Sequence, residues 1–288
     1  MRKKNIGLLL LVVMMMTVIA GCSSSSNKVK LAYVAWDSEI ASTYVLKEVL
    51  ETKLGANVEM IQVDAGPMWA GLAKGSVDGM VSAWLPNTHA AYLEKYGAQI
   101  EDLGANLKGT KVGLAVPAYM EINSIEDLKN SELAATLSNR IIGIEPGAGI
   151  MTTTEKAFAE YGLSDYTLLE SSSAAMTQEL QKAYDNKEPI VVTAWTPHWM
   201  FANMDLKYLQ DPKGAYGADE QIHTMVREGL KEDNPNVYKV LDQFEWTAED
   251  MAKVMVEVQG GETPDEAAKT WVENNPEKVN AWLSGVKL

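Results

Sequence analysis

Short apolar runs alternate with amphipathic stretches through the first third of the chain. The apolar runs predict buried strands at residues 29–36, 57–63 and 79–84. Apolar side chains at helical spacing predict helices at residues 40–54, 67–73 and 88–96, and Pro67 suits the first turn of the second of these. Strands and helices that alternate in this way are typical of a parallel sheet in an α/β fold.

A second alternation of the same kind begins at Arg140. Its predicted elements are a strand at Arg140, a helix ending near Tyr161, a strand at 167–170, a helix at 174–186 and a strand at 189–195. The last strand runs into AWTPHWM (194–200), which repeats AWLPNTH (83–89) at an offset of 111 residues. We interpret the two runs as two lobes built on one plan. Internal duplication and the shared constraints of a common fold both account for the repeat.

The chain is predicted to cross between these lobes twice. Residues 111–120 have the composition of a strand that leaves the first lobe, and Ser124 then suits the N-cap of a helix in the second. Residues 206–214 are predicted as the return, and helical spacing from Gln221 onward predicts a tail that covers the first lobe. The expected first lobe is residues 29–112 and 211–288, and the expected second lobe is residues 113–210. Two α/β lobes with a cleft between them describe a binding protein that closes about a hinge.

The N-terminus has the pattern of an export signal. Three basic residues at positions 2–4 precede an apolar stretch at 6–20, and small residues lead into Cys22. A cysteine at that place predicts a lipoprotein signal over residues 1–21, a lipidated Cys22 and a polar tether over 22–28. The alternative is a transmembrane anchor, but the apolar stretch is shorter than the ~20 residues that a span needs. We therefore expect a domain held by lipid on the outer face of a membrane.

Composition excludes several classes of site and partner. Cys22 is the single cysteine, so no disulfide, thiolate nucleophile or cysteine metal site is expected in the mature domain. The formal net charge is −14, which makes nucleic acid an unlikely partner. Three scattered histidines without a local metal-binding pattern predict no zinc site. No G-x-S-x-G motif is present, and Asp37 with Glu39 is a weak candidate for a catalytic pair, more typical of capping and solvent-facing groups. No enzyme and no cofactor are expected.

The chain has eight Trp and three Phe. A core that needed only aromatic bulk would use Phe, whose ring has no N–H that must be hydrogen-bonded. Trp36, Trp84 and Trp195 each stand where a predicted strand ends, and ligands of open α/β sheets bind beyond those ends. Three indole faces would form a cage suited to a quaternary ammonium ion, which makes no strong hydrogen bond and is held by cation–π contact. The alternative is that they are core residues at the rim of the sheet. The tryptophans of the C-terminal tail, Trp246, Trp271 and Trp282, are expected in the core.

A possible anion site accompanies this cage. EPGAGIM (145–151) places a glycine-rich turn between a predicted strand and a predicted helix, so the N–H groups of Gly149 and Ile150 would be free to bind a carboxylate or phosphate. His89, five residues after Trp84, would supply a further donor. The alternatives are an ordinary tight turn and a surface or capping histidine. The turn lacks the lysine of a P-loop and the spacing of a dinucleotide fingerprint.

The whole mature chain resembles the substrate-binding lipoproteins of glycine betaine/proline betaine ABC importers. The motifs that carry the resemblance are AYVAWDSEIAS, AGPMW, SAWLPNTH, GIEPGAGIM, SSAAM, AWTPHWMF, KYLQDPK and IHT. It implies a type II periplasmic-binding-protein fold and a tryptophan prism made of Trp36, Trp84 and Trp195. It also implies that the N–H groups of Gly149 and Ile150 and the side chain of His89 hold the ligand carboxylate.

The resemblance further implies capture of glycine betaine, with proline betaine beside it, and delivery to permease and ATPase subunits for osmoprotection. Carnitine and choline remain the alternative ligands; a carboxylate site disfavours choline, and carnitine is longer. A sugar-binding lipoprotein is a rival, although the predicted strand ends are poor in the polar side chains that sugar hydroxyls need. A surface-anchored hydrolase using Asp37 or Glu39 is the other rival.

Overall fold

The structure, a computed structural model, describes residues 28–287. The predicted leader, Cys22 and the tether as far as residue 27 lie outside these residues. Lys28, the last residue of the predicted tether, is the first residue of β1 (Lys28–Tyr33). Within residues 28–287, no helix has both the length and the apolar character needed to cross a membrane.

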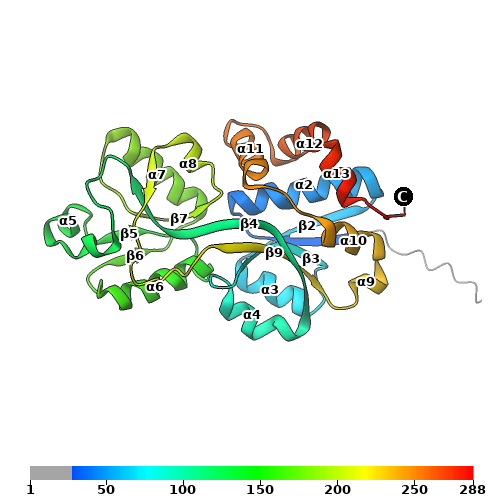
Figure 1. The fold of residues 1–288 in the computed structure, drawn as a ribbon, viewed down its shortest axis with the longest axis horizontal. Helices are drawn as coiled ribbons and strands as arrows, with labels where there is room; N and C mark the ends of the chain where they lie inside the picture. The colour runs from blue at the N-terminus through cyan, green and yellow to red at the C-terminus, as the bar shows by residue number, and fades with distance from the viewer. Residues whose placement is uncertain (1–27, 288) are drawn as a thin grey trace, which may run out of the picture.

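Two α/β lobes are joined by two long strands, β4 (Ile100–Pro117) and β9 (Glu220–Arg227), as Figure 1 shows. The strands of the first lobe are β1, β2 (Asn57–Gln62) and β3 (Gly79–Leu85). Those of the second lobe are β5 (Arg140–Ile142), β6 (Thr167–Leu169), β7 (Val192–Thr196) and β8 (Leu206–Tyr208).

The strand order is β2-β1-β3-β9-β4-β7-β5-β6, with β8 paired to β4. In the first lobe β1 pairs in parallel with β2 and β3, and in the second β5 pairs in parallel with β6 and β7. The connecting strands β4 and β9 run antiparallel to each other, β9 runs antiparallel to β3, and β4 runs antiparallel to β7 and β8. The predicted two-lobed α/β fold is confirmed, with a parallel set of three strands in each lobe extended by antiparallel connectors.

Helices cover both faces of each lobe (Figure 1). In the first lobe, α2 (Asp37–Leu54) lies on one face with the tail helices, and α3 (Ala65–Ala73) and α4 (Ala90–Tyr96) lie on the other. A short 3-10 turn η1 (Gly97–Gln99) follows α4. The tail helices are α9 (Leu230–Asp233), α10 (Pro235–Gln243), α11 (Ala248–Gln259), α12 (Pro264–Asn274) and α13 (Pro276–Trp282). The second lobe carries η2 (Ile125–Lys129), α5 (Ser131–Thr136), α6 (Gly149–Tyr161), α7 (Ser173–Asn186) and α8 (Met200–Asn203).

The core follows from the apolar pattern. Helix α2 buries Val45, Leu46, Val49 and Leu50 completely. The three tail tryptophans are buried as expected: Trp271 stacks on Trp282 with ring centroids 5.6 Å apart, and Trp246 meets Trp271 edge-on. Paired aromatic rings of this kind contribute about 0.5–1.5 kcal/mol beyond the area they bury. The tail therefore closes the first lobe through aromatic packing.

The second crossing differs from the prediction. Residues 220–227 form the strand β9, whereas helical spacing was expected from Gln221 onward, and the segment 206–214 contributes only the short strand β8 inside the second lobe. Strand β9 lies between β3 and β4 and is hydrogen-bonded to both, so its β-branched residues Ile222, Thr224 and Val226 are buried by neighbours distant in sequence. Such tertiary pairing overrides a local helical pattern.

The structure matches one of two predicted helix N-termini and shifts the other. Helix α3 begins at Ala65, so Pro67 is its third residue and not its first. Ser124 does cap a helix, because its hydroxyl accepts from the Glu126 N–H and forms a capping box with Asp127. The helix that it caps, η2, is a 3-10 helix. The N-cap prediction is confirmed.

Candidate functional site

A small pocket lies between the lobes. The first lobe contributes Trp36, Ser38, Trp84, Thr88 and His89 to its lining. The second lobe contributes Ile144, Ala148, Gly149, Ile150 and Trp195, and β4 contributes Val112 between them. All six residues singled out from the sequence line this one pocket. The lining residues include no Asp, Glu, Lys or Arg.

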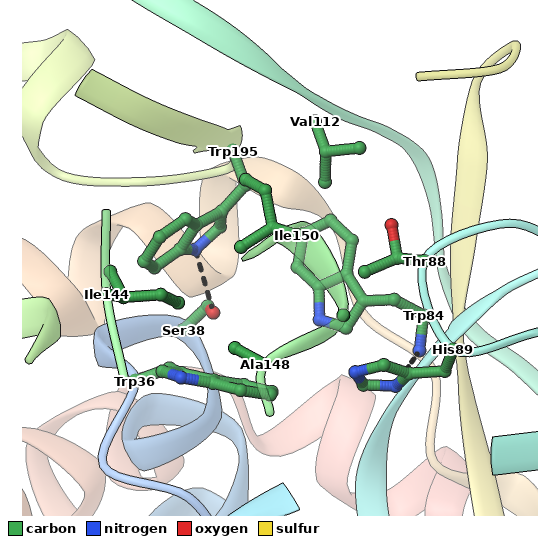
Figure 2. Close-up of a pocket in the computed structure, with 11 residues that line it drawn as sticks. Trp36, Ser38, Trp84, Thr88, His89, Val112, Ile144, Ala148, Ile150 and Trp195 are labelled. Carbon is green, nitrogen blue, oxygen red and sulfur yellow. Dashed lines mark hydrogen bonds between the residues drawn. The ribbon is translucent and has the colours of Figure 1, made fainter. Parts of the chain in front are cut away.

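Three indoles surround the space in Figure 2. Trp36 follows β1 as the N-cap residue of α2, Trp84 is the sixth residue of β3, and Trp195 lies near the end of β7. Since β1 and β3 are adjacent parallel strands, their ends bring the first two together; β7 brings the third from the other lobe. Each tryptophan is at most 5 % exposed. Their faces form a cage of the kind that binds quaternary ammonium groups by cation–π contact.

Hydrogen bonds from two of these indoles cross the lobe boundary. The Trp36 Nε1–H donates to a carboxylate oxygen of Glu145 in the second lobe. The Trp195 Nε1–H donates to Ser38 Oγ in the first lobe over 3.2 Å. Sequence reasoning did not identify Ser38 or Glu145, because nothing in their local sequence indicates what they face across the cleft.

His89 is neutral and presents one free donor. Its Nδ1 accepts the Trp84 backbone N–H at 3.1 Å, so the ring proton lies on Nε2, which has no hydrogen-bond partner among the described residues (Figure 2). The side chain is 1 % exposed, and this burial lowers its pKa to about 3. The ring packs between aromatic neighbours, with centroids 5.8 Å from both Trp36 and Trp69. The Nε2–H is therefore a buried donor at the wall of the pocket that has no acceptor among the described residues.

The N-terminus of α6 forms the wall that carries Gly149 and Ile150. Both residues belong to its first turn, where backbone N–H groups have no acceptor within the helix. The partial positive charge of a helix N-terminus favours an anionic group there. His89 Nε2 and these two N–H groups thus provide donors from both lobes.

The two acidic residues considered for catalysis lie behind the pocket. Burial works to raise the pKa of Asp37, but the facing His198 and hydrogen bonds from Trp199 Nε1 (2.9 Å) and Ser173 Oγ (3.0 Å) lower it overall. These partners belong to the second lobe, so Asp37 links the lobes. Glu39 is 2 % exposed within the first lobe and accepts from Ser82 Oγ; the expectation that it faces solvent is wrong. Burial raises its pKa to about 8.

The sequence reasoning also missed the smaller residues of the lining, Thr88, Val112, Ile144 and Ala148. They carry no local motif; Thr88 and Ala148 stand within the two turns that were singled out. Among residues 28–287, no group of three or more His, Cys, Asp or Glu is placed to hold a metal ion.

Residues 27–274 match the family model described as the substrate-binding domain of ABC-type glycine betaine transport systems. The glycine betaine/carnitine transport binding protein GbuC of Listeria monocytogenes is 56% identical over 158 residues. That match covers 54% of this chain and 53% of GbuC, so the chain spans about half the length of this curated relative.

Two solved structures are similar over most of both chains. Lactococcal OpuAC, in its closed-liganded conformation with glycine betaine, has 49% sequence identity and a TM-score of 0.84, covering 89% of this chain and 99% of its own. An ABC-transporter choline-binding protein in complex with choline has 28% identity and a TM-score of 0.83, covering 91% and 93%. With its two-lobed fold, its interlobe pocket and the match over residues 27–274, this chain belongs to the family of substrate-binding domains of ABC-type glycine betaine transport systems.

Proposed function

We propose that this chain captures glycine betaine outside the cell and delivers it to the permease of an ABC importer. The observation that carries the proposal is an interlobe pocket lined by three indoles and by the unpaired Nε2–H of His89. The trimethylammonium group occupies the tryptophan cage, and the carboxylate accepts from His89 Nε2 and from the N–H groups of Gly149 and Ile150. A zwitterion of this size needs both subsites and no charged side chain.

Binding and closure are one event in this proposal. Trp36, Trp84 and His89 come from the first lobe, whereas Trp195, Gly149 and Ile150 come from the second. A ligand that contacts both sets binds the closed form more tightly than the open form and so shifts the protein toward closure. The closed form is what the permease and its ATPase partner recognise. The chain therefore acts as a binding protein and not as an enzyme.

Proline betaine shares the quaternary nitrogen and the carboxylate, and is the second ligand that we propose. Carnitine, which appears in the name of GbuC, has the same two groups farther apart. Choline, the ligand of one structural relative, lacks the carboxylate and would leave the donors at His89 and α6 unpaired. We accordingly place glycine betaine first, with carnitine and choline as the alternatives.

The cellular setting belongs to the same proposal. Lipid attached at Cys22 holds the domain at the outer face of the cell membrane, beside its permease. Uptake of betaine then serves osmoprotection, since betaine accumulates without disturbing proteins.

Calorimetric titration of the chain from Lys28 onward with glycine betaine and choline tests the proposal. We expect saturable one-to-one binding of glycine betaine, much weaker binding of choline, and a large loss in Trp84→Ala. Each cation–π contact contributes about 1–2 kcal/mol in a site without water. Equal binding of both ligands would retain the cage and reject the anion site. Binding of neither would reject the function and return attention to sugars.

A further inference from the structure

Two of the three cage indoles are held by acceptors from the opposite lobe. Trp36 stands in the first lobe and donates to Glu145 of the second, while Trp195 stands in the second lobe and donates to Ser38 of the first. We call these the crossed pair of hydrogen bonds. Figure 2 shows the Trp195–Ser38 bond beside the cage. Each lobe thus supplies the group that orients an indole of the other lobe.

The orientation of an indole decides what its face can bind. A tryptophan side chain rotates about two torsions, and a cation is attracted only when it lies over the ring face, within about 6 Å of its centroid. A buried indole N–H needs an acceptor, so the position of that acceptor selects the ring rotation. Glu145 does not line the pocket, so it acts on a ligand through Trp36. Ser38 does line the pocket, and its hydroxyl oxygen is the acceptor that orients Trp195.

The crossed pair exists only when the lobes are together, because donor and acceptor of each bond belong to different lobes. We propose that Glu145 and Ser38 are positioning residues, which give Trp36 and Trp195 their binding orientation as the lobes close. The proposal rests on the proposed function and deepens it. The cage is then incomplete in the open form and reaches its full selectivity for a quaternary nitrogen at closure.

Another interlobe hydrogen bond provides a matched control. The Tyr92 hydroxyl, from the first lobe, donates to the Gly147 carbonyl oxygen of the second at 2.7 Å. It orients no cage indole, although the Tyr92 ring stacks on Trp69. Tyr92→Phe removes this bond and keeps the ring, so it weakens closure without touching the crossed pair.

The experiment compares two ligands across four variants of the mature chain. Glycine betaine and dimethylglycine, which has one N-methyl group fewer, are titrated calorimetrically into wild type, Glu145→Ala, Ser38→Ala, Tyr92→Phe and Glu145→Gln. We expect Glu145→Ala and Ser38→Ala to weaken glycine betaine binding about tenfold. This is the loss in affinity that corresponds to one missing hydrogen bond whose buried indole donor is left without an acceptor. In both variants the preference for glycine betaine over dimethylglycine falls by about threefold or more.

The controls separate positioning from closure. Tyr92→Phe weakens both ligands by the same factor and keeps the preference, and Glu145→Gln, which retains an oxygen acceptor, stays near wild type. Because the crossed pair is absent from the open form, the ligand-free variants should melt at the wild-type temperature. A preference unchanged in both alanine variants would overturn the proposal, since they would then behave like Tyr92→Phe. A markedly lower melting temperature of the ligand-free variants would overturn it too, by showing that the bonds stabilise the lobes themselves.

Failure of the proposed function gives a different result. In that case the wild-type chain does not bind glycine betaine at all. The affinity of the wild type thus decides the function, and the ratio of affinities in the variants decides the roles of Glu145 and Ser38.

Discussion

Gly149 faces the carbonyl oxygen of Thr88 across the lobe boundary with no room for a side chain between them. A Cβ added at Gly149 would lie less than 3.0 Å from that oxygen, closer than real Cβ atoms come. The oxygen belongs to the backbone of the turn that also carries His89, so it cannot move aside without moving the donor. Glycine at this position is therefore a condition for closure.

Gly149→Ala should leave each lobe folded and prevent full closure. We expect glycine betaine affinity to fall by at least tenfold, because the clash arises only when α6 meets the Thr88 turn. Calorimetry and the melting temperature of the ligand-free protein measure the two effects. Gly66→Ala is the control, since its Cβ would meet its nearest neighbour, the Tyr92 hydroxyl, at an ordinary 3.7 Å. Wild-type affinity in Gly149→Ala would show that the turn yields.

Glu220 should matter for binding although it does not line the pocket. Glu220 is 1 % exposed, and its carboxylate accepts the backbone N–H groups of Asn87 and Thr88 at 2.8 and 2.7 Å, which fixes the turn leading to His89. Glu220→Gln lacks one acceptor oxygen and the charge. We expect glycine betaine affinity to fall by about three- to tenfold, as for one weakened hydrogen bond.

The same variant has a selective readout. Since His89 serves the carboxylate end of the ligand, choline binding should change much less than glycine betaine binding in Glu220→Gln. Glu228→Gln is the matched control, because Glu228 is exposed and follows the last residue of β9. A uniform loss for both ligands would argue that Glu220 only stabilises the fold.

Stability should decline in acid through His89. The folded protein holds its pKa at about 3, while the ordinary value is 6.5, so between these values the unfolded chain binds the extra proton. The free energy of unfolding therefore falls as pH drops from 6.5 toward 3, by up to about 1.4 kcal/mol per pH unit. Urea unfolding from pH 4 to 8 measures this effect as the difference in slope between wild type and His89→Gln, which keeps an N–H donor, because Glu39 gives the opposite slope between pH 4.5 and 8 in both proteins. Parallel curves for the two proteins would contradict the neutral buried state of His89.

Glu39 should produce the opposite slope. Its pKa is about 8 in the folded protein against an ordinary 4.5, so the folded state binds the extra proton between these values. The free energy of unfolding then falls as pH rises from 4.5 to 8. Glu39→Gln keeps an acceptor for Ser82 and should remove this fall, leaving a protein more stable than wild type at pH 8. If the stability of Glu39→Gln changed with pH as in wild type, the pKa of Glu39 would not be raised, and its ionised carboxylate would have to be in contact with water.

Periodicity and strand-end chemistry predicted much of this molecule. The alternation of apolar runs predicted the two lobes, and the position of Trp36, Trp84 and Trp195 at strand ends predicted their convergence on one pocket. Strand β9 could not be recognised from the sequence, because residues 220–227 adopt a strand only by pairing with β3 and β4, which are distant in sequence. Its neighbour β3, which belongs to the parallel set of the first lobe, was recognisable from its own apolar run.

The sequence by itself determined which residues carry chemistry, since an indole, an imidazole and a glycine turn keep their binding properties wherever the chain places them. The tertiary structure decided how they act together. It brought Glu145 to Trp36 and Ser38 to Trp195, and it left His89 neutral with one unpaired N–H. The two indole hydrogen bonds join segments more than a hundred residues apart and form only when the lobes meet. The state of His89 depends on the backbone N–H of Trp84 and on packing against Trp36 and Trp69 within the first lobe.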